Sequence, residues 1–386
     1  MSDLYRNAMA ARLAKLPADV PQLDDHEEDE AGDSLGSLPG SGLGPPAMQV
    51  MMSPLPRPAM NRKRKPKREP NPAFSPLSGS TFFSEAAQVS VSSRSLDVRV
   101  YYTPPKFNDG TIMICHHGAG YSGLSFACVA KEITDLSKGD CGVLSIDARR
   151  HGKTTSAASD EDLSIEVLVE DFVAVVESVF KDPTTATLLL VGHSMGGSVI
   201  TRACPTLLEK KYKVGGVVVL DVVEGSALEA LPHMHSLLNA RPDGFDSVEE
   251  AIEWHVTTKA IRNTNSARVS IPAIIIPSSS DSPAVPPFIW RTTLRSTAPY
   301  WTSWFTGLSK QFLSARTARL LILAGTDRLD KELMIGQMQG KFQMEVVPGV
   351  GHMLHEDDPT RLAEILVEFW RRNERLVAGI KKVGDL

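Results

Sequence analysis

The sequence predicts an α/β protein with a mostly parallel central sheet flanked by helices. Continuous apolar runs alternate with segments of helical spacing, which is typical of parallel strands that are covered on both faces and joined by crossover helices. A serine stands in a Gly-x-Ser-x-Gly turn directly between one such run and one such helix. The alternation is interrupted over about 223–316 by a stretch too long for a simple connection.

Two kinds of spacing define the individual elements. An alternating pattern over 87–91 and 96–102 predicts an antiparallel hairpin. The apolar runs that predict buried strands are 112–115, 142–146, 187–191, 216–220, 320–324 and 342–347. The helical patterns between them are 125–136, 165–180, 198–208, 330–337 and 360–371. We therefore assign residues 76–386 to one α/β domain.

The interruption at about 223–316 has its own pattern. Helix-like pieces at 226–238, 248–261 and 301–312 accompany a Pro/Ser-rich loop at 272–287. We interpret the stretch as a helical cap inserted between two strands. Such an insertion lies over the C-terminal edge of the sheet, where ligands bind in open α/β folds.

The N-terminal residues 1–75 differ from the rest. They contain an acidic block (24–30), a stretch rich in Gly, Pro and Ser (32–58) and a basic block (62–68). Such a segment buries too little apolar surface to offset the ordering of its backbone, so we expect a disordered tail. The basic block is compatible with a nuclear-import signal, a nucleic-acid patch or a solvated charge run.

Composition excludes some classes of protein. The formal net charge of −5 does not favour a general polyanion binder, so nucleic acid is not an expected partner. The chain has no signal-like leader and no run of about 18 apolar residues, so no membrane span is predicted. The 4 cysteines lack a paired-ligand spacing. We expect free thiols, no metal, no cofactor and a location in the cytoplasm, the nucleus or both.

Ser194 is the predicted nucleophile. It follows the apolar run 187–191 and precedes a helix of small residues, which is the context of a nucleophile elbow. Gly192 and Gly196 flank it because side chains there would collide with a neighbouring strand or helix. The hydroxyl of such a strained turn is exposed to substrate.

An activated serine needs a base, and two histidines near the end of the domain are candidates. His352 ends the Gly-Val-Gly-His turn after the last predicted strand, at the same sheet edge as Ser194. His355 is the competitor, but it leads into acidic residues. We therefore predict His352 as the base.

The local sequence does not distinguish between two candidates for the acid that orients the base. Asp221 follows the strand at 216–220, and Asp327 follows the strand at 320–324. Both lie between the serine and the histidine in chain order, as a hydrolase triad requires. Asp147 precedes Ser194 and is a poor candidate; with Arg149 it is expected to fix the loop that ends at His151.

Two backbone N–H groups are expected to form the oxyanion hole. One belongs to Met195, directly after the nucleophile. The other comes from the glycine loop 117–120, with Ala119 as the first choice and Gly120 as the second. Together with the serine turn and the late Gly-His, this loop predicts acyl transfer from an ester.

Several longer motifs resemble those of the protein phosphatase methylesterases. They are LDVVEG (220–225), AIEW (251–254), IRN (261–263), SARVS (266–270), AG (324–325), DRLDK (327–331) and IGQMQGKFQM (335–344). The similarity covers about 72–372. It implies an α/β-hydrolase fold with a cap and makes Asp221 the triad acid, because the family's aspartate is the one in Asp-Val-Val-Glu-Gly. The family usually has glycine where this chain has Ala119, but only the backbone amide is needed there.

The resemblance also implies a substrate and a partner. These are the methyl ester on the C-terminal leucine of the protein phosphatase 2A catalytic subunit, which is hydrolysed to release methanol, and that phosphatase itself. In this family the phosphatase also helps to organise the site, so the free chain is expected to be partly inactive. The alternatives are a small-molecule carboxylesterase and a scaffold that binds an inactive phosphatase.

Overall fold

The computed structural model describes residues 69–157, 161–280, 282, 284–325 and 329–377. The acidic and basic blocks, most of the predicted tail and Asp327 therefore lie outside the described residues. The sequence places the end of the tail at residue 75, but Pro72–Phe74 already form a 3₁₀ turn. The Arg268 side chain donates a hydrogen bond of 2.6 Å to the Ser75 carbonyl. The last residues of the predicted tail thus belong to the folded domain.

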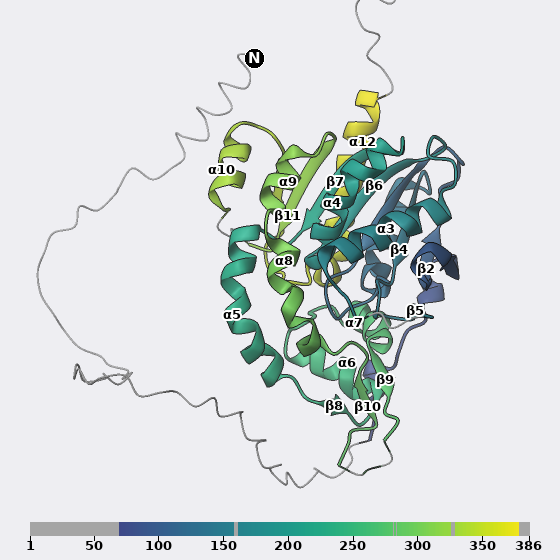
Figure 1. Ribbon diagram of the computed structural model, residues 1–386. Helices are drawn as coiled ribbons and strands as arrows, with labels where there is room; N and C mark the ends of the chain where they lie inside the picture. The colour runs from purple at the N-terminus through teal and green to yellow at the C-terminus, as the bar shows by residue number, and fades with distance from the viewer. Residues whose placement is uncertain (1–68, 158–160, 281, 283, 326–328, 378–386) are drawn as a thin grey trace, which may run out of the picture. The chain divides into compact units, whose positions relative to one another are not determined.

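The central sheet combines an antiparallel hairpin with a run of parallel strands (Figure 1). Its order is β1 (Glu85–Val91), β2 (Leu96–Thr103), β4 (Cys141–Ile146), β3 (Thr111–His116), β6 (Thr187–His193), β7 (Lys213–Leu220), β11 (Ala318–Leu323) and β12 (Gln343–Val346), with β5 (Thr155–Ser156) paired to β2. β2 is antiparallel to both neighbours, and the strands from β4 to β12 are parallel. This is the predicted fold class.

Helices cover both faces of the sheet and create two cores. α2 (Ala127–Ser137) and α12 (Pro359–Val377) pack together on one face, and α3 (Ile165–Val179) and α4 (Met195–Glu209) pack on the other. Successive strand side chains point to opposite faces. In β3, Ile112 and Ile114 therefore enter the core under α3 and α4, while Met113 and Cys115 enter the other. This explains why the strand sequences are continuously apolar rather than alternating.

In the chain, the cap is inserted between β7 and β11, two neighbouring parallel strands of the sheet. β7 ends at Leu220 and β11 begins at Ala318. The elements between them are α5 (Glu224–Ala240), β8 (Gly244–Phe245), α6 (Val248–Thr257), α7 (Thr264–Ser270), β9 (Ile275–Pro277), β10 (Phe288–Trp290), α8 (Trp301–Phe305) and α9 (Leu308–Ser314). After the cap come α10 (Lys331–Met338) and the short α11 (Leu354–Asp357).

The cap differs from the sequence prediction in several places; α6 ends at Thr257, and α7 lies where no helix was predicted. β8, β10 and β9 form a small antiparallel sheet, so part of the predicted Pro/Ser loop is strand. Pro277 is tolerated there because β9 is an edge strand. The predicted helix at 301–312 is broken at Gly307, which has φ +80° and separates α8 from α9. The Glu224 carboxylate accepts the N–H groups of Gly307 and Ser309 at 2.7 and 3.0 Å and fixes this break.

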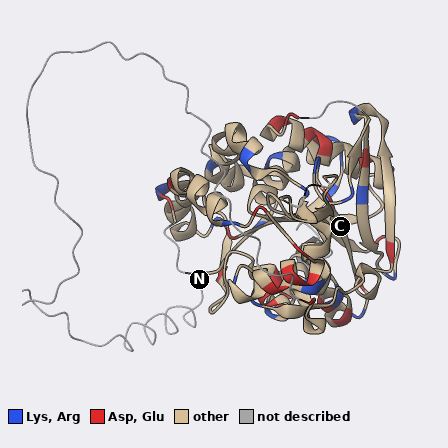
Figure 2. Cartoon of the chain, turned by 90° about the horizontal axis from the view of Figure 1, so that it is seen from below, with Lys and Arg blue, Asp and Glu red and all other residues tan. Residues whose placement is uncertain are grey.

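Apolar residues fill the interior, and charged residues of both signs are interspersed around the described chain (Figure 2). The 4 cysteines, Cys115, Cys128, Cys141 and Cys204, are free and buried. Within the described residues, no helix is both long and apolar enough to cross a bilayer.

Candidate functional site

Ser194 occupies a strained turn between β6 and α4. Its backbone angles are φ 52° and ψ −120°, a conformation that costs of order 1–3 kcal/mol for a residue other than glycine. A Cβ on Gly192 would stand 2.3 Å from the Gly196 carbonyl oxygen, and one on Gly196 would stand 2.2 Å from the His116 oxygen. Both glycines are therefore required for the close packing of this turn, as the sequence predicts.

Asp221 and His352 form a hydrogen-bonded pair at the same sheet edge. His352 Nδ1 donates to Asp221 Oδ2 at 2.7 Å, so the neutral ring presents a lone pair on Nε2. The Ala324 N–H, at the end of β11, donates to Asp221 Oδ1 at 2.8 Å. The carboxylate side chain is 9% exposed and the imidazole 56% exposed. A buried acid thus orients a base that reaches the solvent-facing side of the site.

In the described part of the chain the base is paired with Asp221. Asp327, the other candidate acid, lies outside the described residues. Ser194, Asp221 and His352 all line one cavity. Among the described hydrogen bonds, none joins the Ser194 hydroxyl to the His352 imidazole. The Asp221–His352 hydrogen bond of the predicted proton relay is present in the structure.

His355 does not compete with His352 for the serine. Its side chain is completely buried and is stacked between the rings of His193 and Phe126, at centroid distances of 4.4 and 4.6 Å. Burial lowers the pKa of His355 to about 3. His193 separates it from His352, whose carbonyl oxygen accepts from His193 Nε2 at 2.8 Å. His352 lines the cavity of Ser194, whereas His355 does not, so His352 stays the predicted base.

The structure separates the two candidates for the second oxyanion amide. The Gly120 N–H already donates to His151 Nε2 at 2.9 Å, which favours Ala119 as the predicted second donor. Ala119 is partly exposed and lines the cavity together with Met195, the first residue of α4. A Cβ on Gly118 would stand 3.3 Å from the Ser194 Cβ, so the loop passes close to the nucleophile. This leaves the amides of Ala119 and Met195.

Two buried neutral histidines hold the glycine loop. His151 Nδ1 donates to the Arg149 carbonyl at 2.7 Å, which leaves Nε2 as the acceptor for Gly120. His117 Nδ1 donates to the Gly118 carbonyl at 2.7 Å, and its Nε2 accepts the Ala148 N–H at 3.0 Å. Burial lowers the pKa of His151 to about 4 and that of His117 well below its usual range. Both rings therefore act at neutral pH as fixed donors and acceptors.

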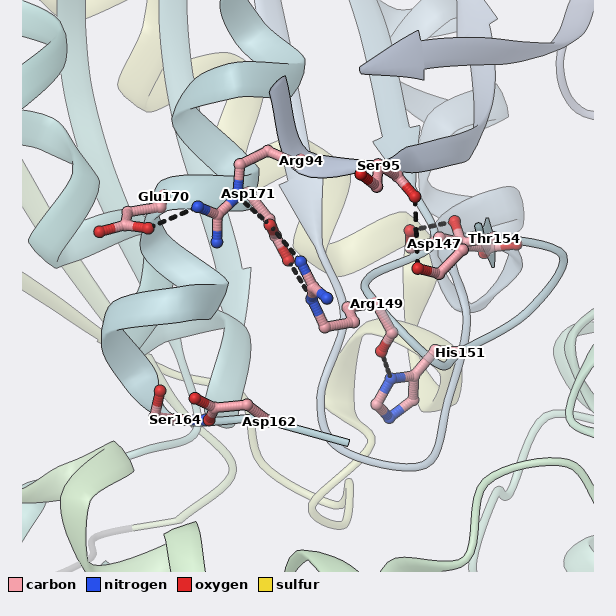
Figure 3. A network of polar contacts seen from close by, with 11 residues as sticks. Arg94, Ser95, Asp147, Arg149, His151, Thr154, Asp162, Ser164, Glu170 and Asp171 are labelled. Atoms are coloured by element: carbon pink, nitrogen blue, oxygen red, sulfur yellow. Dashed lines mark hydrogen bonds and ion pairs between the residues drawn. The ribbon is translucent and has the colours of Figure 1, made fainter. Parts of the chain in front are cut away.

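A buried ion pair anchors the segment that carries His151 (Figure 3). Arg149 makes two hydrogen bonds to the Asp171 carboxylate, at 2.6 and 2.8 Å, and Arg94 adds a third at 2.7 Å. Asp147 accepts the N–H groups of Gly123 and Lys153, each at 2.7 Å. Burial raises the pKa of Asp147 to about 6. The predicted role of Asp147 and Arg149 in fixing this loop agrees with these contacts.

The cavity beside Ser194 has a volume of about 740 Å³. Apolar side chains from α5 and α8 contribute to its wall, and Gly118 and Ala119 of the glycine loop also line it. Among the described residues, no group of three or more His, Cys, Asp or Glu is placed to hold a metal ion. The arrangement supplies a nucleophile, a base with its acid and two amide donors beside an apolar pocket.

Known proteins resemble this chain in sequence and in fold. The Alpha/beta hydrolase family profile matches residues 113–365. "Protein phosphatase methylesterase 1" of Cryptococcus neoformans var. neoformans serotype D (strain JEC21) is 43% identical over 100% of this chain and 96% of its own length. The chain belongs to the protein phosphatase methylesterase family. It is a carboxylic ester hydrolase, and the predicted family resemblance is confirmed.

Other comparisons agree with membership of the methylesterase family. The Gibberella zeae protein with the same name is 46% identical over 74% of this chain and 72% of its own length. Among solved structures, E-2-(acetamidomethylene)succinate hydrolase superposes with a TM-score of 0.58 at 17% identity, over 74% of this chain and 99% of that one. A marine microorganism esterase gives a TM-score of 0.52 at 19% identity, over 70% and 98%. At these identities the structures show the α/β-hydrolase fold alone.

We expect Asp221→Asn to lower kcat for ester hydrolysis by about 10³–10⁴-fold, because an amide at this position disfavours the Nδ1–H tautomer of His352 and cannot stabilise its cation. Asp327→Asn is the matched variant and should change kcat by less than about tenfold. Steady-state kinetics on an aryl acetate would measure both. A large loss in Asp327→Asn with a small loss in Asp221→Asn would contradict the assignment.

The stability of the fold should depend on the neutral form of His151. The imidazole is protonated near pH 6.5 in the unfolded chain but only near pH 4 in the folded chain. The contribution of the neutral ring to the free energy of unfolding is therefore complete above pH 6.5 and is lost as the pH falls toward 4. Between pH 7 and 5, wild-type protein should lose about 1–2 kcal/mol more unfolding free energy than His151→Gln, which keeps an acceptor for Gly120. Urea unfolding at both pH values measures this. Equal losses would show that His151 is not a buried neutral group.

Proposed function

We propose that this protein hydrolyses the methyl ester on the C-terminal leucine of the protein phosphatase 2A catalytic subunit and releases methanol. The observation that carries the proposal is the Asp221–His352 pair beside Ser194 in a chain whose relatives are named protein phosphatase methylesterase. The family motifs at 220–225 and 327–344 support the same substrate. The phosphatase is the proposed partner, and its methylated tail is the proposed ligand.

The proposed reaction proceeds through an acyl-enzyme. Ser194 attacks the ester carbonyl while His352 takes its proton, and Asp221 stabilises the imidazolium. The N–H groups of Ala119 and Met195 stabilise the oxyanion, each contributing about 3 kcal/mol to the transition state. Methoxide leaves with a proton from His352 as methanol. Water then attacks the acyl-enzyme with His352 as base and releases the free carboxylate.

The apolar wall of the cavity suits a leucine residue. Side chains from α5 and α8 that contact this space include Leu231, Met234, Trp301 and Phe305. Burying a leucine side chain against such a wall contributes roughly 1.5–3 kcal/mol to binding. A small-molecule carboxylesterase with the same triad is the alternative. It would be favoured by fast turnover of aryl esters together with no activity on methylated phosphatase.

Ser194→Ala should abolish methanol release from methylated phosphatase while the protein stays folded, because only the nucleophilic oxygen is removed. The measurement is methanol or residual methyl ester after incubation with wild type and variant, with circular dichroism as the control for folding. A fluorophosphonate probe should label wild type at Ser194 and leave the variant unlabelled. Demethylation by folded Ser194→Ala protein would overturn the proposed nucleophile.

The family resemblance predicts that the phosphatase also helps to organise the site. We expect the free chain to hydrolyse a small ester slowly and to do so faster when the phosphatase is present, because docking would favour the arrangement in which the imidazole reaches the hydroxyl. The comparison is the initial rate of aryl ester hydrolysis with and without unmethylated phosphatase. Equal rates would contradict this part of the proposal.

A scaffold role and a cellular location are separate questions. Binding and inhibition of the phosphatase by Ser194→Ala would indicate that the chain also holds an inactive phosphatase.

We propose a location in the cytoplasm, the nucleus or both, with the basic block 62–68 as the candidate import signal. Nucleic-acid binding would be supported only by a salt-dependent interaction that is lost when the tail is deleted.

A further inference from the structure

One wall of the active-site cavity carries an arginine. Arg241 is the residue directly after α5 and contacts the same cavity as Ser194. Its guanidinium carbon lies 3.6 Å from the centroid of the Trp290 ring. The indole N–H of Trp290 donates to the Pro242 carbonyl at 2.8 Å, which fixes the ring under the guanidinium. The side chain is thus held in place by stacking, with its N–H groups left available.

The positive charge of Arg241 has no counter-ion in the described part of the protein. No hydrogen bond or ion pair joins its guanidinium to a described carboxylate, whereas other partly buried arginines, such as Arg94 and Arg149, pair with Asp171. Tyr121 and a second cation, Arg295, are the groups that act on it electrostatically. A guanidinium stays charged and keeps five donors. A half-buried cation with free donors favours a ligand that brings oxygen acceptors.

A second polar group near Arg241 is also unsatisfied. His255 is 1% exposed, lines the same cavity, and donates from Nδ1 to the Ala251 carbonyl at 2.7 Å. Its Nε2 is therefore an acceptor, and it is buried without a hydrogen-bond partner. Leaving such an atom unpaired is unfavourable, and a ligand N–H would remove that cost. The cavity thus contains a free donor set and a free acceptor, which together match the C=O and N–H groups of a peptide chain.

Two residues that line the cavity together with Arg241 and His255 are close in sequence to the predicted catalytic residues. Tyr121, which contacts the cavity with Arg241, follows the glycine loop two residues after Ala119. Met353, which also contacts it, directly follows His352. A simple aryl or alkyl ester has no group for Arg241 or His255 to bind. A substrate that continues as a peptide on the acyl side of the ester does.

We propose that Arg241 is a specificity-determining residue that binds an oxygen acceptor in the peptide segment preceding the esterified residue, with His255 Nε2 accepting a peptide N–H, so that the site selects peptidyl methyl esters over simple esters. This inference rests on the proposed function, since it assumes a peptidyl substrate. The acceptor has two possible sources, a main-chain carbonyl or an acidic side chain of the same segment. The guanidinium fork binds either one.

The test compares the full-length wild type with Arg241→Met on three substrates. They are p-nitrophenyl acetate, an acetylated neutral tripeptide ending in leucine methyl ester, and the same tripeptide with a glutamate. Since a hydrogen bond to a charged group contributes about 1.5–3 kcal/mol, the ratio of kcat/KM for peptide ester to that for aryl ester should fall about 10–100-fold in Arg241→Met. An equal fall for both peptides identifies a main-chain carbonyl, and a fall for the glutamate peptide alone identifies a carboxylate.

Two further variants keep the test sharp. Arg295→Met removes a neighbouring cation whose side chain donates to the Leu238 carbonyl and does not line the cavity, so the ratio should stay within about twofold. Arg241→Lys keeps the charge and should recover part of the ratio, even if Arg241→Met is poorly folded. If the ratio of kcat/KM for peptide ester to that for aryl ester is the same in wild type, Arg241→Met and Arg241→Lys, the inference is overturned and the proposed function is not affected. Wild-type protein that cleaves the aryl ester but neither peptide ester overturns the proposed function, and the inference with it.

Discussion

The site depends on the contact between the ends of two neighbouring parallel strands, β3 and β6. A Cβ on Gly196 would collide with the His116 carbonyl, and a Cβ on Gly118 would collide with the His193 ring and stand 3.3 Å from the Ser194 Cβ. This contact places the amides of one loop beside the hydroxyl of another turn. Parallel register makes it possible, because the carboxyl ends of adjacent strands meet at one edge of the sheet. The acid and the base are added at the same edge from β7 and from the turn after β12.

Buried polar groups convert that contact into a fixed geometry. The amide of Gly120 and the carbonyl of Gly118 are each bound by a neutral histidine, and the segment of His151 is tied through Arg149 to Asp171 on α3. The imidazoles here work as paired donors and acceptors, because burial keeps them uncharged. The exposed His352 is different, since its ring is open to the cavity and contacts a carboxylate. Environment, rather than residue type, separates the predicted base from the supporting histidines.

Sequence alone predicts the parts of the site that lie within one local motif. The turn at Ser194 and the strand ends follow from glycine spacing and apolar runs. The choice between Ala119 and Gly120 does not, because it depends on His151, which is 31 residues from Gly120 in the chain. The signal for His151 is its position in the loop after β4, a strand adjacent to β3. Asp221 and Asp327 were equivalent locally, since both follow strands, and only the family motif or the contact with His352 favours Asp221.

The start of α5 connects the cap to the acid of the site. α5 begins at Glu224, so only Val222 and Val223 separate this helix from Asp221. Glu224 in turn ties α5 to the break before α9 through the amides of Gly307 and Ser309. α5 also supplies one wall of the cavity. The N-terminal end of the helix is therefore joined both to the acid of the site, through a two-residue link, and to the break between α8 and α9, so that one element fixes a cavity wall and the position of the carboxylate.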